Sequence, residues 1–172
     1  AVKLLLGRGA DVNKADDEGY TSMWGAAEGG HVEVLKLLLD CGVDVNKADN
    51  GGETSLIAAA ERGHVEAIKL LLDHGADVDK ANKGGETGVW TAASHGHVGT
   101  LKVLLGGGAD VNKADEDGAT PLYMAADGGH TDTVALLITT GEADATLTCQ
   151  GYSPLMAAKE EGHQAIVALL EE

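Results

Sequence analysis

Apolar and polar positions alternate along the chain in a pattern that predicts pairs of short helices. After Gly63, apolar side chains follow the i, i+3, i+4 spacing of one helical face: Val65, Ile68, Leu71 and Leu72. A shorter helix is expected at about residues 54–61, and the small pair Ala59-Ala60 keeps it thin enough for neighbouring layers to approach. The pattern therefore predicts a short first helix, a turn and a longer second helix that turns its apolar face inward.

This pattern returns at a constant step of 33 residues. The glycines that open each copy are Gly19, Gly52, Gly85, Gly118 and Gly151, and the Gly-His turns lie at Gly30-His31, Gly63-His64, Gly96-His97, Gly129-His130 and Gly162-His163. A fixed period of this size indicates a stacked array in which each unit contacts only its neighbours. We therefore predict one domain over residues 1–172, with a half unit at 1–13 and five units that begin near residues 14, 47, 80, 113 and 146.

Residues at the unit boundaries match the chemistry of helix ends. A hydroxyl that can accept a backbone N–H precedes each first helix: Thr21, Thr54, Thr87, Thr120 and Ser153. Pro121 and Pro154 follow where a missing N–H costs nothing. Gly75 suits the left-handed conformation that ends the second helix, and Asp77 can bond to the turn that follows.

Three stretches resemble the ankyrin repeat. They are Thr120-Pro121-Leu122-Tyr123-Met124-Ala125-Ala126 and the Gly-Ala-Asp-Val-Asn sequences at 9–13 and 108–112. The resemblance covers the whole chain and implies an all-α solenoid of stacked helix-turn-helix units joined by β-turn finger loops. The His that follows Leu in the family is replaced by Trp24, Ile57, Trp90, Tyr123 and Met156. That replacement puts the turn-bracing hydrogen bonds of this His in question.

Composition narrows the classes of partner. The formal net charge of −16 opposes binding to nucleic acid and to anionic membranes, and it favours a basic protein surface. Solubility alone is an equally good explanation of the charge. No run of 18 apolar residues predicts a membrane-spanning helix. Because Phe is absent and only two Trp occur, the core is expected to be aliphatic.

The two cysteines, Cys41 and Cys149, lie more than three units apart, too far for a disulfide. Unpaired thiols are typical of a reducing compartment, so we expect a cytoplasmic or nuclear location. Val2, Leu5 and Leu6 match the second helix of an incomplete unit, and the last residues stop before a helix-ending Gly. We therefore expect an excised segment of a longer array, with weak end-to-end self-association through its uncapped ends.

The sequence contains no recognisable motif for catalysis or metal binding. Five of the seven His residues recur once per layer, so they are expected to bond to a neighbouring backbone rather than to converge on a metal. His95 and His97 form the one close pair, without an obvious third ligand. The acidic turn before Gly118 lacks the ligands of a calcium loop, and no nucleophile elbow or phosphate loop occurs. We expect no enzyme activity and no cofactor.

The resemblance implies a binding site on the concave face, formed by finger tips and first helices. Carried over residue by residue, the positions are Asp17, Glu18, Tyr20, Glu28, Asn50, Glu53, Glu61, Arg62, Lys83, Glu86, His95, Glu116, Asp117, Tyr123, Asp127, Tyr152 and Glu160. Acidic residues dominate this set, which predicts a basic peptide or protein as partner. The alternative is a structural spacer or targeting segment of a larger enzyme or channel, without a partner of its own.

Three further expectations concern single residues. Trp24 and Trp90 either anchor a partner or fill space, with space-filling slightly favoured, whereas Tyr123 and Tyr152 should reach the surface. The resemblance implies that oxygenases could hydroxylate the loop asparagines, which are Asn13, Asn46 and Asn112. The third unit is rich in glycine, so backbone hydrogen exchange should be fastest near residues 85–110.

Overall fold

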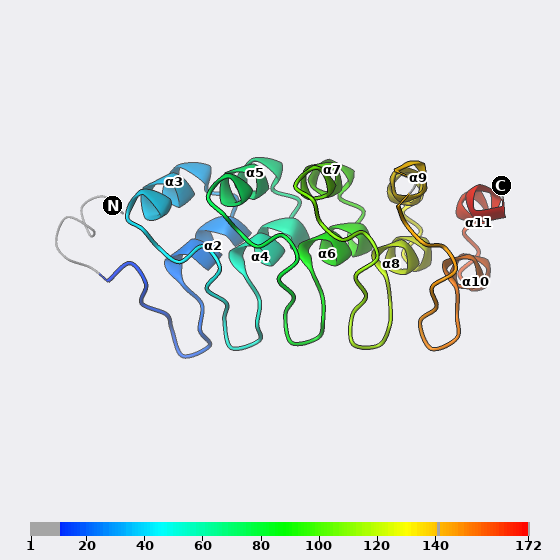
Figure 1. Cartoon of the computed structure of the whole chain (residues 1–172), viewed down its shortest axis with the longest axis horizontal. Helices are drawn as coiled ribbons and strands as arrows, with labels where there is room; N and C mark the ends of the chain where they lie inside the picture. Colours follow the sequence, from blue (N-terminus) through cyan, green and yellow to red (C-terminus); the bar gives the residue numbers. More distant parts are fainter. Residues whose placement is uncertain (1–10, 141, 172) are drawn as a thin grey trace.

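The computed structural model describes residues 11–140 and 142–171, which form ten helices in five consecutive pairs (Figure 1). The first helices are α2 (Ser22–Glu28), α4 (Ser55–Glu61), α6 (Gly88–Ser94), α8 (Pro121–Asp127) and α10 (Pro154–Glu160). The second helices are α3 (Val32–Asp40), α5 (Val65–Asp73), α7 (Val98–Gly106), α9 (Thr131–Thr139) and α11 (Gln164–Glu171). Within the described residues, extended backbone forms only isolated bridges, so the all-α prediction is confirmed.

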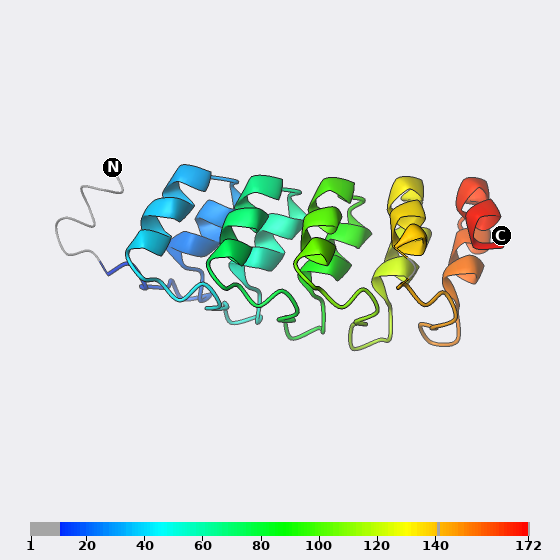
Figure 2. The same cartoon turned by 45° about the horizontal axis from the view of Figure 1, so that its top comes forward.

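The helices stack into two rows. Each first helix contacts the next first helix along the array, and the second helices contact one another in the same order. Finger loops project from the row of first helices on the side away from the second helices (Figures 1 and 2). The predicted helix-turn-helix solenoid is therefore confirmed. Residues 1–10 of the predicted half unit, with Val2, Leu5 and Leu6, lie outside the described residues.

A continuous aliphatic strip fills the space between the rows. Its largest fully buried apolar side chains are Leu35, Leu38, Ile68, Leu71, Leu101, Leu104, Leu122, Leu137, Ile166, Val89 and Val134. In α5 the inward face differs slightly from expectation, because Val65 and Leu72 are only half-buried and Ala67 is fully buried instead. Ala67 precedes Ile68 and lies one helical turn before Leu71, so the buried face is centred on Ala67, Ile68 and Leu71.

The predicted helix ends are confirmed. Each hydroxyl before a first helix accepts the backbone N–H three residues later, at 3.1–3.3 Å. Gly75 has a φ of +83°, and the Asp77 carboxylate accepts the N–H of Asp79 in the following turn. These contacts satisfy backbone groups that a short helix leaves without an internal partner.

Histidine links each unit to the one before it. The Nε2–H of His64 donates to the backbone oxygen of Glu28 at 3.0 Å, and the same bond recurs from His97, His130 and His163 to the last residue of the preceding first helix. Because a carbonyl oxygen only accepts, Nε2 must carry the proton. The prediction that the Gly-His residues bond to a neighbouring backbone is confirmed for these four.

Two loop asparagines form a second link between units. The Asn46 amide donates to the Gly75 oxygen at 3.1 Å, and its oxygen accepts the N–H of Asp77 at 2.8 Å. Asn112 makes the equivalent pair with Glu142 and Asp144, both at 2.7 Å. Two of the three side chains that the resemblance marks for hydroxylation, Asn46 and Asn112, therefore hold the turn of the next unit in place.

Backbone bonds connect successive finger loops, but the last junction differs. The N–H groups of Asn50, Lys83 and Glu116 each donate to an oxygen of the preceding finger, at 2.8–3.0 Å. In the fifth finger the N–H of Cys149 instead donates to the Tyr152 oxygen of its own loop, at 2.9 Å. The Cys149 thiol, a weak donor, lies 3.5 Å from the Asp117 oxygen.

The altered fifth finger has a cause in the sequence. In the first four fingers a carboxylate or amide oxygen accepts two backbone N–H groups and sets the loop, from Asp16, Asp49, Asn82 or Asp115. Thr148 stands at this position in the fifth. Without that acceptor the loop closes more tightly, with φ of 50° at Gln150 and 89° at Gly151, as in a two-residue hairpin turn.

Candidate functional site

The finger loops and first helices form one surface, here termed the inner face (Figure 1). Three columns of side chains run along it: one from the finger residue just before each N-cap, and two from positions four residues apart, which share one side of each first helix. The first column is Tyr20, Glu53, Glu86, Ala119 and Tyr152; the second is Trp24, Ile57, Trp90, Tyr123 and Met156; the third is Glu28, Glu61, Ser94, Asp127 and Glu160. A mostly apolar column thus lies between two columns that carry carboxylates.

A pocket of about 300 Å³ opens on the inner face between the second and third units. Ile57 and Trp90 supply apolar lining, and the carboxylates of Glu53, Glu61 and Glu86 surround it. Its remaining lining comes from Asn82, Thr91, Ser94 and His95. The Asn82 amide donates to Glu86 at 2.6 Å, so that carboxylate is held in place.

The electrostatics of this pocket disfavour an isolated negative charge. Burial is the main cause that raises the pKa of Glu53, and the carboxylates of Asp49, Glu61 and Glu86 raise it further. The Trp24 side chain opposes this rise. Even so, the buried Glu53 Oε1 and the Trp24 indole N–H form no hydrogen bond, either with each other or with another described group. A cation placed here would relieve a charge that the fold leaves uncompensated.

Arg62 is the basic residue that pairs with carboxylates of this region. Its guanidinium lies 2.9 Å from Glu28 and 3.8 Å from Glu61, and it joins the first two units. All three side chains are at least one-third exposed, so the pairs are screened by water and contribute little to stability. Among the residues lining the pocket there is no Lys or Arg.

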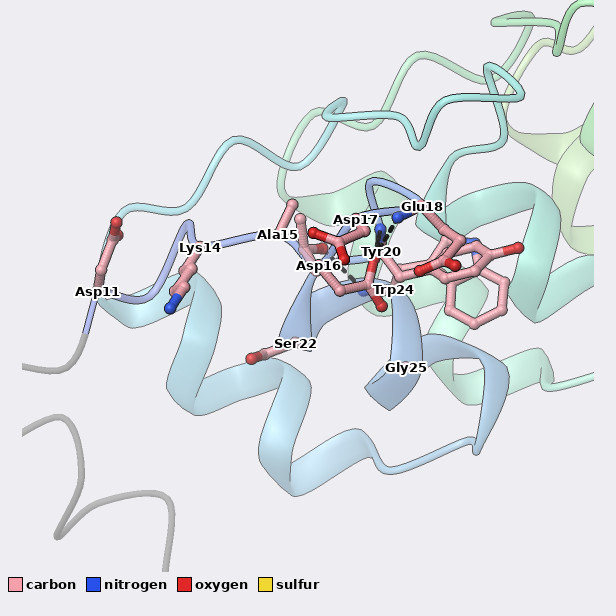
Figure 3. Close-up of a pocket in the computed structure, with 11 residues that line it drawn as sticks. Asp11, Lys14, Ala15, Asp16, Asp17, Glu18, Tyr20, Ser22, Trp24 and Gly25 are labelled. Carbon is pink, nitrogen blue, oxygen red and sulfur yellow. Dashed lines mark hydrogen bonds between the residues drawn. The ribbon is translucent and has the colours of Figure 1, made fainter.

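A second, larger hollow of about 850 Å³ lies at the first unit, and Figure 3 shows its lining. The rings of Tyr20 and Trp24 are in contact there, with centroids 4.1 Å apart and planes tilted by 36°. Burial raises the pKa of Tyr20, and four neighbouring carboxylates add to the rise. This hollow also extends over Asp11 and Lys14, at the boundary with residues that the structure does not describe. We therefore base no site on it.

The aromatic residues of the second column have different surroundings. The Trp90 indole donates to the Ala119 oxygen at 3.0 Å, so Trp90 braces the next finger as well as lining the pocket. Ile57 is buried, with 4% exposed. Tyr123 is half-buried, while Met156 is 48% and the neighbouring Tyr152 46% exposed. The prediction that Tyr152 reaches the surface is confirmed.

Comparison with known proteins agrees with this architecture. A family model described as ankyrin repeats (3 copies) matches residues 1–82 and 89–172. The chain belongs to the ankyrin-repeat family. A search of curated proteins found no match. Ankyrin repeats are generally protein–protein interaction modules and are typically not catalytic.

The structure of this ankyrin array brings together part of the predicted site. Glu53, Glu61, Glu86 and His95 line one pocket, and Asp17, Glu18 and Tyr20 line the hollow at the first unit. Asn50, Lys83, Glu116 and Asp117 occupy finger tips, whereas Glu28, Arg62, Asp127 and Glu160 lie at the ends of first helices. The last two residues of the set, Tyr123 and Tyr152, lie in the fourth and fifth units.

The predicted site residues leave out Ile57, Asn82, Trp90 and Thr91 of the pocket, and also Met156. Ile57 lines the pocket, and Met156 is strongly exposed. The sequence could have identified Ile57 and Met156, because both occupy the same column as Trp24, Trp90 and Tyr123. Among the described residues, no group of three or more metal-ligating side chains converges, and no helix is long and apolar enough to cross a membrane.

Proposed function

We propose that the inner face of this ankyrin array binds a basic segment of another protein. The observation that supports this most strongly is the pocket between α4 and α6, where three carboxylates surround an apolar lining. A Lys or Arg side chain fits both features, because its aliphatic stem packs on apolar atoms while its charged end reaches the carboxylates. The indole of Trp90 can add a cation–π contact.

The charge of the whole chain supports the same partner. A net charge of −16 attracts basic segments over long range and speeds their encounter with the array. Long-range attraction alone would not select one surface. The pocket supplies the selectivity, since carboxylates of three side chains meet there beside an apolar lining.

A charge-reversal experiment with a matched control tests this proposal. The site variant is Glu61→Lys with Glu86→Lys; the control is Asp40→Lys with Asp73→Lys, which makes the same change of net charge on exposed ends of α3 and α5. The probe is a fluorescein-labelled 12-residue peptide of alternating Lys and Ser. Fluorescence anisotropy measures its Kd at low and high salt.

We expect the site variant to weaken binding by about tenfold or more, because repulsion replaces attraction at the contact itself. The control should lose only about twofold to threefold, and this loss should vanish at high salt as long-range attraction is screened. Equal losses in both variants would show that net charge alone drives binding. An unchanged site variant would exclude the pocket as the docking surface.

A further inference from the structure

The second and third finger loops are built alike but differ in the side chain at their centre. In both, one side-chain oxygen accepts the backbone N–H groups two and four residues later, from Asp49 at 2.8 and 2.7 Å and from Asn82 at 2.9 and 3.0 Å. The residue four positions on is a glutamate of the pocket in each case, Glu53 or Glu86. At this position the two fingers therefore differ by one carboxylate oxygen exchanged for an amide nitrogen.

That exchange gives the two glutamates opposite surroundings. The Asn82 amide donates to Glu86 Oε2 at 2.6 Å, and a hydrogen bond to a charged acceptor is stronger than one between neutral groups. Asp49 has no such proton to donate. Burial is the main cause that raises the pKa of Glu53, and Asp49 is the first of the carboxylates that raise it further. A donor thus fixes the Glu86 carboxylate, whereas the neighbours of Glu53 oppose its charge.

The third carboxylate of the pocket, Glu61, is shared with a cation of the protein itself. The Arg62 guanidinium lies 3.8 Å from Glu61 and 2.9 Å from Glu28. A cation from a partner must compete with Arg62 for this charge. Glu86 forms no ion pair among the described residues, and the amide that holds it is neutral. Its negative charge is therefore not offset by a nearby cation of the protein.

We propose that Glu86 is the principal counter-ion of the pocket and that Asn82 positions it for a Lys or Arg side chain of the partner. Glu53 and Glu61 add attraction from the neighbouring unit. This inference rests on the proposed function and names which of the three carboxylates receives the charged group. The bond from Asn82 orients the Glu86 carboxylate before a partner arrives, so less side-chain freedom is lost on binding.

Glutamine substitutions compare the three carboxylates at an equal change of charge. Glu86→Gln, Glu53→Gln and Glu61→Gln each remove one negative charge, and fluorescence anisotropy gives the Kd of each variant for the 12-residue peptide of alternating Lys and Ser. We expect Glu86→Gln to weaken binding by about tenfold. The other two should each weaken it by about threefold or less. If Glu86→Gln loses no more affinity than the other two, the assignment of the counter-ion is wrong.

Asn82→Asp tests the positioning role. Asp occupies the same position in three other fingers, so the loop keeps its acceptor and should fold, which circular dichroism checks. The substitution adds a carboxylate, and attraction to a cation adds pair by pair. Charge alone would therefore tighten peptide binding by the same factor with Glu86 present or replaced by Gln. We expect the factor to be at least about threefold larger in the Glu86→Gln background, because the new carboxylate otherwise displaces Glu86. Equal factors would overturn the positioning role.

Thermal unfolding without peptide separates this inference from the proposed function. Asn82→Asp should lower the Tm at pH 7, and most of that loss should disappear in the Glu86→Gln background, since it arises from the Asn82–Glu86 pair. The reverse exchange, Asp49→Asn, should raise the Tm because it offers Glu53 a donor and removes a repulsion.

If these Tm changes appear but the native protein does not bind the peptide, the Asn82–Glu86 bond is only structural, and the counter-ion assignment fails together with the proposed function. If the peptide binds but the effect of Asn82→Asp on Tm does not depend on Glu86, the proposed function stands and the role given to Asn82 is wrong.

Discussion

At the scale of single residues, Glu53 illustrates a conflict between stability and binding. Its carboxyl is partly buried beside other carboxylates, and its pKa is raised. A raised pKa means that the folded state holds this proton more tightly than the unfolded state does. The charge therefore reduces stability as the pH rises through the unfolded and then the folded pKa, and the whole cost is present once the pH lies above the folded pKa.

Substitution of Glu53 should separate these effects. Glu53→Gln removes the charge, so we expect a Tm raised by no more than about a few degrees at pH 7, because solvent screens a side chain of this exposure. At pH 3 the two proteins should have the same Tm, since Glu53 is protonated there. The same variant should bind the Lys–Ser peptide more weakly. A lower Tm at pH 7 would contradict the described role of Glu53.

Two glycines with the same empty surroundings should respond in opposite directions to alanine. A Cβ at Gly25 or at Gly75 would meet no atom within 4 Å. Gly25 lies inside α2, where alanine favours the helix, whereas Gly75 has a φ of +83° that alanine resists. We expect Gly25→Ala to stabilise by about 0.4–1 kcal/mol and Gly75→Ala to destabilise by about 1 kcal/mol or more in urea unfolding. The same sign for both would contradict this assignment.

Most residue roles that repeat could be predicted from the sequence, because a role that recurs at a step of 33 is observed five times. The helix-capping hydroxyls and the Gly-His links are of this kind. The double hydrogen bond of Asn46 to the next unit was not predicted, since it depends on where the neighbouring turn lies. Sequence spacing within one unit contains no such information.

At the scale of elements, α5 offers the sharpest test of the packed strip. Leu71 is fully buried, whereas Leu72 on the same helix is only half-buried. Leu71→Ala should reduce the free energy of unfolding by about 2–5 kcal/mol, through lost burial and a residual cavity. Leu72→Ala should cost clearly less, since fewer of its contacts are lost. Equal costs, or a Leu71 cost below about 1 kcal/mol, would place the buried face elsewhere.

The third unit remains the expected weak point among the central units. Its second helix, α7, contains Gly99 and ends at Gly106, and the buried hydroxyl of Thr100 has no hydrogen-bond partner. Each of these lowers helix stability relative to α5, which carries alanine or larger residues at the matching positions. Amide hydrogen exchange should therefore be faster in α7 than in α5. Exchange in α6 should be raised together with that in α7, because both helices belong to the third unit. Equal protection of α5 and α7 would contradict this.

The finger loops show how far sequence patterns define an element. Finger loops were expected in all five units, and the first four share one design. The fifth loses its backbone bond to the fourth, and the cause is visible as Thr148 among Asp16, Asp49, Asn82 and Asp115. The period of 33 residues identifies what the units share, and it does not predict the effect of a single departure such as Thr148. Loop closure depends on one acceptor, so a single substitution changed the register.

At the scale of the whole molecule, stacking turns local repeats into one surface. A side chain at one position of a unit has neighbours 33 residues away in each direction. Columns therefore form from contacts between adjacent units alone. The acidic character of the inner face was predicted from composition and family resemblance. The exposed pair Tyr152 and Met156 was only partly predicted, since exposure depends on what packs beside each side chain.

The most direct test of this account is chemical-shift mapping by NMR with the 12-residue Lys–Ser peptide. We predict that the largest amide shifts fall on finger tips and first helices, over residues 17–28, 50–61, 83–94, 116–127 and 150–160. Second helices α3, α5, α7 and α9 should show little change. Shifts that are largest on those second helices, or spread evenly over the protein, would contradict the claim that the inner face is the docking surface.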